Sequence, residues 1–270
     1  MKMLINGINL NVKDTQKGET ALIFQHFWGG SSRTWDDVVA RLRDTFRCIT
    51  LDARGAGGSD APAKGYRTQD HADDVRGVIA ALGLKRYVLV GHSMGGKAAQ
   101  LLASERPLGL EGLVLVASSP LSPMNFPQEQ REQMKSTYIS REAVIWTLEN
   151  VLTGTPVAAV QREQLIADAL RMSPQAISGW TDTGMAEDLH HHAAQINVPV
   201  AIVAGELDRV DPIDVVKTHI IASYPSADVH FLAGFGHLLP VEAPEQVAAI
   251  VRDFVTKTAQ RRQQTPPSSL

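Results

Sequence analysis

One serine stands between paired glycines at the point where an apolar run gives way to a helical pattern. The stretch "LVGHSMGGKAAQ" (89–100) places Ser93 in the spacing G-x-S-x-G, between a predicted strand and a predicted helix. A tight turn of this kind lifts a nucleophile clear of the backbone, and the flanking Gly91 and Gly95 leave it room. The helix N-terminus would aim free N–H groups at an oxyanion beside Ser93. The alternative is an ordinary strand–glycine–helix turn capped by a serine.

A serine hydroxyl is a poor nucleophile unless a base takes its proton and an acid orients that base. The run "VPVAIVAGELDRVDP" (198–212) ends a predicted strand and supplies Asp208, and "VHFLAGFGHLLP" (229–240) ends the next and supplies His237. The order Ser, Asp, His at the ends of successive strands predicts a triad of Ser93, His237 and Asp208. His237 could instead be an ordinary loop histidine, and Asp208 could be a turn residue. Asp211, just before Pro212, is the competing residue at this point and the natural helix N-cap.

Acyl transfer through a tetrahedral intermediate also needs two hydrogen-bond donors for the oxyanion. One is expected from the backbone N–H of Met94, directly after the nucleophile. The second is expected from the loop "FWGGSS" (27–32), where glycines let the chain fold over the site. The N–H of Trp28 is the preferred donor and that of Phe27 its competitor. Their side chains are expected to face the substrate, although plain packing would explain them equally well.

Strand-like and helix-like segments alternate along most of the chain. Strands are predicted over 2–5, 8–12, 21–26, 46–52, 87–91, 110–118, 198–205 and 227–234, and helices over 35–42, 69–82, 94–106, 213–221 and 244–257. Asn6-Gly7 favours a hairpin between the first two strands. The other strands are nearly continuous apolar runs, as in sheets covered on both faces. This alternation predicts an α/β fold with a mostly parallel sheet and right-handed crossovers.

One long stretch breaks the alternation and divides the chain. Residues 120–195 show only helical patterns and are predicted to form a helical cap, inserted between core parts 1–119 and 196–259. The cap carries large apolar side chains that could line a pocket. They are Phe126, Met134, Tyr138, Trp146, Met172, Trp180 and Met185, with Trp146 and Trp180 the preferred substrate contacts. The Pro/Ser-rich tail, 260–270, is expected to be disordered.

Composition and charge exclude several classes of function. The 270 residues carry a formal net charge of −3, which gives no electrostatic reason to expect nucleic acid or an anionic membrane as a partner. The single Cys48 rules out an internal disulfide, and the N-terminal apolar run is too short for a signal peptide, so we expect a cytoplasmic protein. We expect it to be a monomer or a homodimer. No metal or other cofactor is expected, because successive histidines 190–192 on a helix cannot converge on one ion.

Four segments together resemble the α/β-hydrolase superfamily, in particular its small capped esterase-like members. They are "GHSMGG", "LDARGAGGSDAP", "GELDRVDP" and "GHLLPVEAPEQV". The resemblance implies a mostly parallel eight-stranded sheet flanked by helices, with the helical cap inserted after strand 6. Asp52 and Arg54, in the second segment, are expected to tie loops together. One departure is that Phe27 follows His26 where the family usually has glycine, which narrows the acyl pocket and puts the second oxyanion donor in doubt.

The combined pattern predicts a serine hydrolase that cleaves a small to medium apolar carboxylic ester through an acyl-enzyme. A serine at position 93 argues against similar haloalkane dehalogenases and epoxide hydrolases, which use aspartate there. Lactonase, C–C bond hydrolase and perhydrolase chemistry with the same triad stay open, because fold does not choose among them. An alternative of another class is a ligand receptor or pseudoenzyme that retains the fold.

Overall fold

The strands form a single eight-stranded sheet. The computed structural model describes residues 1–264, with strands β1 Lys2–Ile5, β2 Ile8–Asp14, β3 Ala21–Gln25, β4 Arg47–Leu51, β5 Tyr87–His92, β6 Leu110–Val116, β7 Val200–Gly205 and β8 Asp228–Leu232. Their spatial order is β1-β2-β4-β3-β5-β6-β7-β8. The β1–β2 hairpin and the β2–β4 pair are antiparallel, and every other pair is parallel. The predicted α/β class and the mostly parallel sheet are confirmed.

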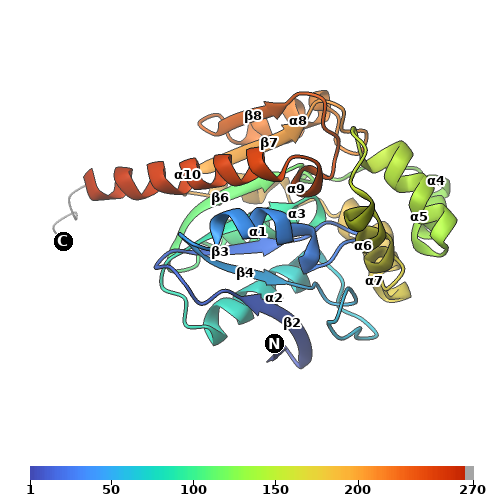
Figure 1. The fold of residues 1–270 in the computed structure, drawn as a ribbon, viewed down its shortest axis with the longest axis horizontal. Coiled ribbons are helices and arrows are strands. Elements are labelled where there is room, and N and C mark those ends of the chain that lie inside the picture. The colour runs from blue at the N-terminus through green and yellow to red at the C-terminus, as the bar shows by residue number, and fades with distance from the viewer. Residues whose placement is uncertain (265–270) are drawn as a thin grey trace.

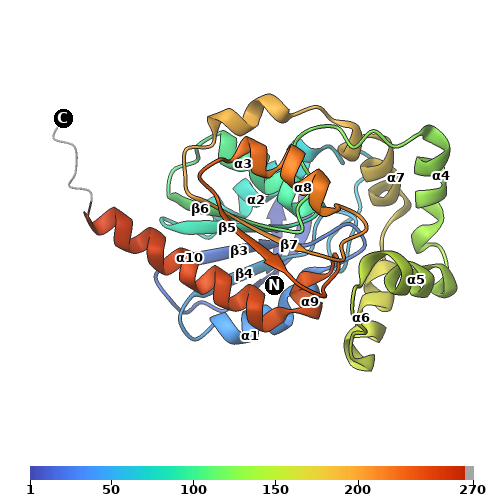
Figure 2. The same cartoon turned by 90° about the horizontal axis from the view of Figure 1, so that it is seen from above.

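Helices cover both faces of this sheet (Figure 2). One face carries α1 Asp36–Leu42, α9 Leu239–Glu242 and α10 Pro244–Gln264, and the other carries α2 Thr68–Ala81, α3 Met94–Ser104 and α8 Ile213–His219. Every residue of β3 and β5 is buried, which accounts for their unbroken apolar runs. Phe24 and Trp35 are fully buried, and their ring centroids lie 5.0 Å apart with the ring planes tilted by 49°. Burying a large side chain in this way stabilises the fold by about 1.5–3 kcal/mol.

The segment between β6 and β7 is a layer of helices at one end of the molecule (Figure 1). It contains α4 Gln128–Lys135, α5 Arg141–Thr147, α6 Ala159–Ala169 and α7 Pro174–Asp182, joined by short helical turns. The hydroxyls of Ser140 and Ser173 cap α5 and α7 by accepting N–H bonds from the helices' first turns. The layer packs on the core through an apolar cluster that includes Trp28, Met94 and Leu238.

The C-terminal helix is longer than expected from the sequence. Helix α10 continues to Gln264, so residues 260–264 are helical rather than disordered, and 265–270 lie outside the described residues. The physical reason is composition: Gln and Arg are good helix formers, and basic residues in a last turn complement the helix dipole. Arg262 also pairs with Glu111, which holds this end of the helix against β6.

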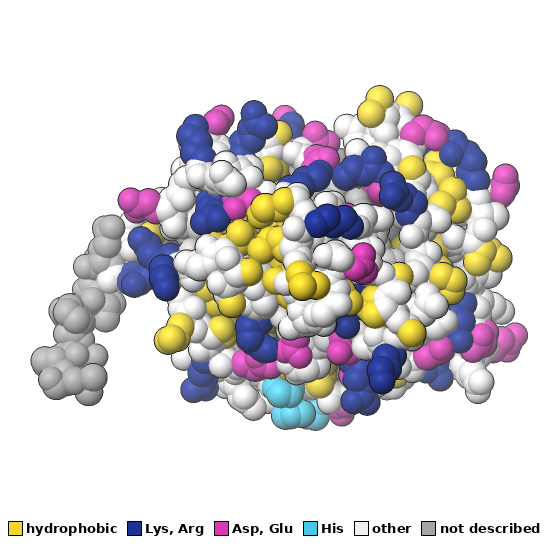
Figure 3. Space-filling model, turned by 90° about the horizontal axis from the view of Figure 1, so that it is seen from below, with side chains coloured by type: hydrophobic (Ala, Val, Ile, Leu, Met, Phe, Trp, Pro, Cys, Tyr) yellow, Lys and Arg dark blue, Asp and Glu magenta, His cyan; other side chains and the backbone are white. Residues whose placement is uncertain are grey.

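Charges of both signs intermingle on the face drawn in Figure 3, with small apolar patches between them. This face therefore has no broad field of one sign. Within residues 1–264, no helix has the length and apolar character needed to cross a bilayer.

Candidate active site

Ser93 occupies a strained backbone position between β5 and α3. Its φ and ψ are 53° and −118°, in the positive-φ region that non-glycine residues rarely adopt. Surrounding hydrogen bonds hold it there. The Ser93 N–H donates to the carbonyl of Ala117 at 3.1 Å, and the Ser93 carbonyl accepts from the N–H groups of Gly96 and Ser119 at 2.8 and 3.2 Å. Strain of this kind persists only where the fold over-determines it, and it clusters at functional sites.

The glycines around Ser93 have no space for side chains. A Cβ at Gly91 would lie 2.5 Å from the Cα of Gly96, and one at Gly95 would lie 2.7 Å from the carbonyl oxygens of Gln25 and His26. A Cβ at Gly96 would collide with the side chain of Ser118. The glycines therefore allow α3 to approach the ends of β3 and β6 closely, as the spacing predicts.

Asp208 and His237 meet in the loops that follow β7 and β8. The carboxylate Oδ2 of Asp208 accepts a hydrogen bond from His237 Nδ1 at 2.8 Å, and both side chains are buried. Asp208 Oδ1 accepts the N–H groups of Val210 and Asp211 at 2.8 and 3.0 Å. Because a carboxylate only accepts, Nδ1 carries the imidazole proton, which leaves Nε2 with a free lone pair.

The environment of His237 acts on its pKa in two opposing ways. Burial lowers the pKa of the imidazole, but attraction to Asp208 and the hydrogen bond from Nδ1 outweigh it, so the pKa lies above 6.5. The pair thus has the character of a general base oriented by an acid.

Asp211 does not act as the helix cap that was its alternative role. The residue preceding α8 is Pro212, and no side chain caps that helix. Asp211 is fully buried, and neither carboxyl oxygen has a hydrogen-bond partner within residues 1–264. Burial raises the pKa of this carboxyl to about 8, so it stays protonated at neutral pH. Of the two aspartates, Asp208 is the one bonded to His237.

The loop after β3 has a defined direction because His26 holds one of its peptide groups. His26 Nε2 accepts the N–H of Ala53 at 2.9 Å, so Nδ1 carries the proton and donates to the carbonyl of Phe27 at 2.7 Å. The N–H of Gly30 donates to the same oxygen at 3.1 Å. In a trans peptide the N–H points opposite to the C=O. Holding the Phe27 carbonyl therefore constrains the direction of the Trp28 N–H from the core side.

A cavity of about 400 Å³ lies between this loop, the serine turn and the helical layer. Ser93 and His237 both line it, with no direct hydrogen bond between them among the described residues. Phe27 and Trp28 form its wall on the core side. The large apolar cap residues predicted from the sequence line it as well, except Met172, which packs between helices. Trp146 is 60% exposed and Trp180 only 6%, so the first stands at the rim and the second deeper.

Met94 is the first residue of α3, and its N–H belongs to the first turn, which has no partner inside the helix. It follows Ser93 directly.

Asp52 and Arg54 tie loops together, as expected. Asp52 accepts the N–H groups of Ser32 and Gly58 at 2.7 and 2.8 Å, and Arg54 binds the carboxylate of Asp74.

Two acidic residues near the site were not identified from the sequence. Asp168 of α6 is buried and accepts hydrogen bonds from Ser31 and Arg33, in the loop that carries Trp28. Glu242 of α9 accepts N–H groups on both sides of His237 and the N–H of Gly154, in the helical layer. A signal existed for Asp168, because it interrupts the apolar run "LIADAL". A carboxylate in such a place needs a partner.

A family model described as the α/β hydrolase fold matches residues 20–244. The chain belongs to this family. It is 26% identical to a 2-(acetamidomethylene)succinate hydrolase of Mesorhizobium japonicum, covering 93% of each chain. It is also 26% identical to a 2-hydroxy-6-oxononadienedioate/2-hydroxy-6-oxononatrienedioate hydrolase of Burkholderia vietnamiensis, covering 93% and 92%.

Solved structures share the fold over nearly the whole chain. A bromoperoxidase from Bacillus anthracis superposes with a TM-score of 0.84 at 23% identity, covering 92% of this chain and 96% of its own. An enol-lactonase from Burkholderia xenovorans superposes with a TM-score of 0.83 at 20% identity, covering 95% and 100%. These likenesses concern architecture, and the chemistry of this chain rests on its own residues.

Crowding at the serine turn predicts a stability defect for Gly95→Ala. The added methyl group meets two backbone carbonyl oxygens that cannot rotate away, so we expect a loss of about 1–3 kcal/mol in the free energy of unfolding. Urea denaturation would measure it. Gly58→Ala is the matched control, because its Cβ would lie 3.5 Å from the nearest atoms. Equal stability of the two variants would contradict the crowding argument.

The opposing influences on His237 predict a titration that depends on Asp208. In the wild type, the pKa of the ring should lie above 6.5. In Asp208→Asn it should fall, because burial then opposes only the weaker attractions to Asp211 and Glu242. NMR titration of histidine-labelled protein would measure both values, with His237→Gln used to assign the signal. The exposed Asp214→Asn is the control and should leave the titration where it was. A pKa that is unchanged in Asp208→Asn would refute this account.

Proposed function

We propose that this protein is a serine hydrolase that cleaves a carboxylic ester of small to medium size through an acyl-enzyme. The observation that carries the proposal is the buried hydrogen bond between His237 and Asp208, on the wall of the cavity that Ser93 also lines. Nucleophile, base and acid come from three loops that follow the parallel strands β5, β7 and β8, at the carboxyl edge where α/β proteins place their sites. We further propose that the protein acts in the cytoplasm.

In the proposed mechanism, Nε2 of His237 takes the proton of Ser93 as the serine oxygen attacks the ester carbonyl. The backbone N–H groups of Met94 and Trp28 bind the oxyanion, and one such donor contributes about 3 kcal/mol to the transition state. Asp208 stabilises the imidazolium. His237 then gives its proton to the departing alcohol, and water attacks the acyl-enzyme by the same steps in the second half.

The cavity wall indicates what kind of substrate fits. Its volume falls in the range of small-molecule sites. Aromatic and methionine side chains line most of it, which favours an apolar acyl or alcohol group. Phe27 occupies the position where a smaller residue would leave more room beside Ser93. Gln130, Gln133 and Thr137 add hydrogen-bonding groups on the cap side, so the substrate also carries a polar portion.

A second candidate is hydrolysis of a lactone or of a C–C bond by the same three residues. One observation favours it: Arg209 is a cationic side chain on the cavity wall, and guanidinium groups bind carboxylates well. Two of the similar proteins are named as hydrolases of the anions 2-(acetamidomethylene)succinate and 2-hydroxy-6-oxononadienedioate. Perhydrolase chemistry is a further alternative on the same triad. A receptor would instead retain ligand without turnover.

The proposal predicts that Ser93→Ala abolishes ester hydrolysis. Initial rates on p-nitrophenyl esters from acetate to octanoate should show turnover by the wild type, with an optimum that measures the acyl pocket. The variant should lose about 10⁴-fold or more in kcat/KM, because the nucleophile is removed. Ser104→Ala, at the far end of the same helix, is the control and should retain full activity. Absence of turnover by folded wild type on every ester, lactone and vinylogous diketone would contradict a hydrolase role.

A further inference from the structure

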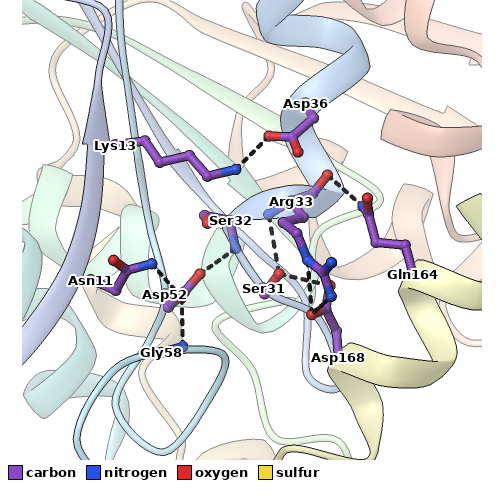
Figure 4. Close-up of polar contacts among 10 residues, drawn as sticks. All are labelled: Asn11, Lys13, Ser31, Ser32, Arg33, Asp36, Asp52, Gly58, Gln164 and Asp168. Carbon is purple, nitrogen blue, oxygen red and sulfur yellow. Dashed lines mark hydrogen bonds and ion pairs between the residues drawn. The ribbon is translucent and has the colours of Figure 1, made fainter. Parts of the chain in front are cut away.

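The loop that carries Trp28 is held from two sides by buried carboxylates (Figure 4). From the core, Asp52 accepts the N–H of Ser32 at 2.7 Å. From the cap, Asp168 of α6 reaches Ser31 and Arg33 in the same loop. The two carboxylates come from different layers of the molecule, so the loop lies between the core and the cap.

The contacts of Asp168 are charge-assisted; its carboxylate is buried, whereas the Arg33 side chain is 38% exposed. Its Oδ2 accepts the hydroxyl of Ser31 at 2.8 Å, and its Oδ1 accepts Nε of Arg33 at 3.1 Å, while Arg33 Nη2 also pairs with it. The Ser31 oxygen accepts the N–H of Arg33 at 3.1 Å. Gln164, one turn earlier on α6, donates to the Arg33 carbonyl at 3.1 Å. One face of α6 thus binds three groups of this turn: the Ser31 hydroxyl, the Arg33 guanidinium and the Arg33 carbonyl.

A second cap residue reaches Trp28 itself. The hydroxyl of Tyr138 donates to the Trp28 carbonyl at 2.8 Å, and the two rings meet edge to face at 4.6 Å. Gly29 has a φ of +102°, and a Cβ there would lie 2.5 Å from the Tyr138 ring. Burial raises the pKa of Tyr138, so its hydroxyl keeps the proton that it donates. The loop conformation at Trp28 and Gly29 is therefore shaped around a cap side chain.

We propose that Asp168 and Tyr138 are positioning residues that place the Trp28 N–H, so that the oxyanion site is complete only when the cap is seated on the core. This inference rests on the proposed hydrolysis for its kinetic consequence, but the placement of the loop stands on the contacts alone. Both residues lie more than a hundred positions from the loop in sequence. Formation of the oxyanion site therefore requires the cap to pack on the core.

The coupling has a characteristic kinetic signature. A displaced oxyanion donor weakens binding of the transition state more than binding of the ester, whose carbonyl carries little charge. We therefore expect Tyr138→Phe and Asp168→Asn each to lower kcat by about 10–100-fold with KM changed less than about threefold, since complete loss of a donor costs about 10²–10³. Binding of a trifluoromethyl ketone, which forms a tetrahedral oxyanion adduct with the serine, should weaken in parallel.

The control is a buried carboxylate pair of the same kind far from the loop. Asp14 at the end of β2 is buried and binds Arg47 through both carboxylate oxygens, at 3.0 and 2.7 Å. Asp14→Asn should reduce stability as Asp168→Asn does, yet leave kcat and inhibitor binding at wild-type values. If Asp168→Asn does not fold, Tyr138→Phe still decides, because it removes one hydroxyl and keeps the ring.

Hydrogen–deuterium exchange of residues 27–35 tests whether the cap holds this loop in place, and it does not depend on catalytic turnover. Exchange in this segment should become faster in Tyr138→Phe and Asp168→Asn and stay unchanged in Asp14→Asn. Wild-type exchange rates in both cap variants, or losses in KM alone, would overturn the proposal. If the wild type cleaves no ester, the proposed function fails, and the exchange experiment still decides whether the cap places this loop.

Discussion

The positive φ of Ser93 is the constraint around which the neighbouring structure is arranged. A serine in this conformation is stable only if the chain around it leaves space and supplies hydrogen bonds, and three nearby glycines and the ends of β3 and β6 provide both. The sheet order brings the loops after β7 and β8 to the same edge, so the acid and the histidine reach the serine without any long excursion of the backbone. Local strain and global topology thus depend on each other.

Buried and half-buried carboxylates hold the loops that surround this turn. Asp52, Asp168, Asp208 and Glu242 each accept hydrogen bonds from two or more groups, most of them backbone N–H groups of loop residues. Loops at the end of a sheet have donors that no strand can satisfy, and an ionised carboxylate satisfies several at once. Asp211 shows the contrast: it lies among the same loops, its carboxyl has no hydrogen-bond partner among residues 1–264, and burial keeps it protonated at neutral pH.

Much of the fold and the core of the site could be predicted because their signals are local. Apolar runs mark the strands, the glycine spacing marks the serine turn, and Asp208 and His237 each follow a strand. Asp168 and Tyr138 could not be predicted in the same way, since their partners lie more than a hundred residues away and only the folded cap brings them together. The sequence pattern places the end of α10 too early, because proline and serine beyond it dominate the composition of the tail. Local pattern identifies elements, and long-range contacts between them need the structure.

The positions of the four tryptophans determine the intrinsic fluorescence of the protein. Trp28, Trp35 and Trp180 are buried, whereas Trp146 is 60% exposed at the cavity rim. An indole in water emits at longer wavelength than one in an apolar interior and is reached by dissolved quenchers. The red, quenchable part of the fluorescence therefore belongs to one residue on the cap. The molecule therefore carries its own solvent-exposed reporter at the rim of the cavity.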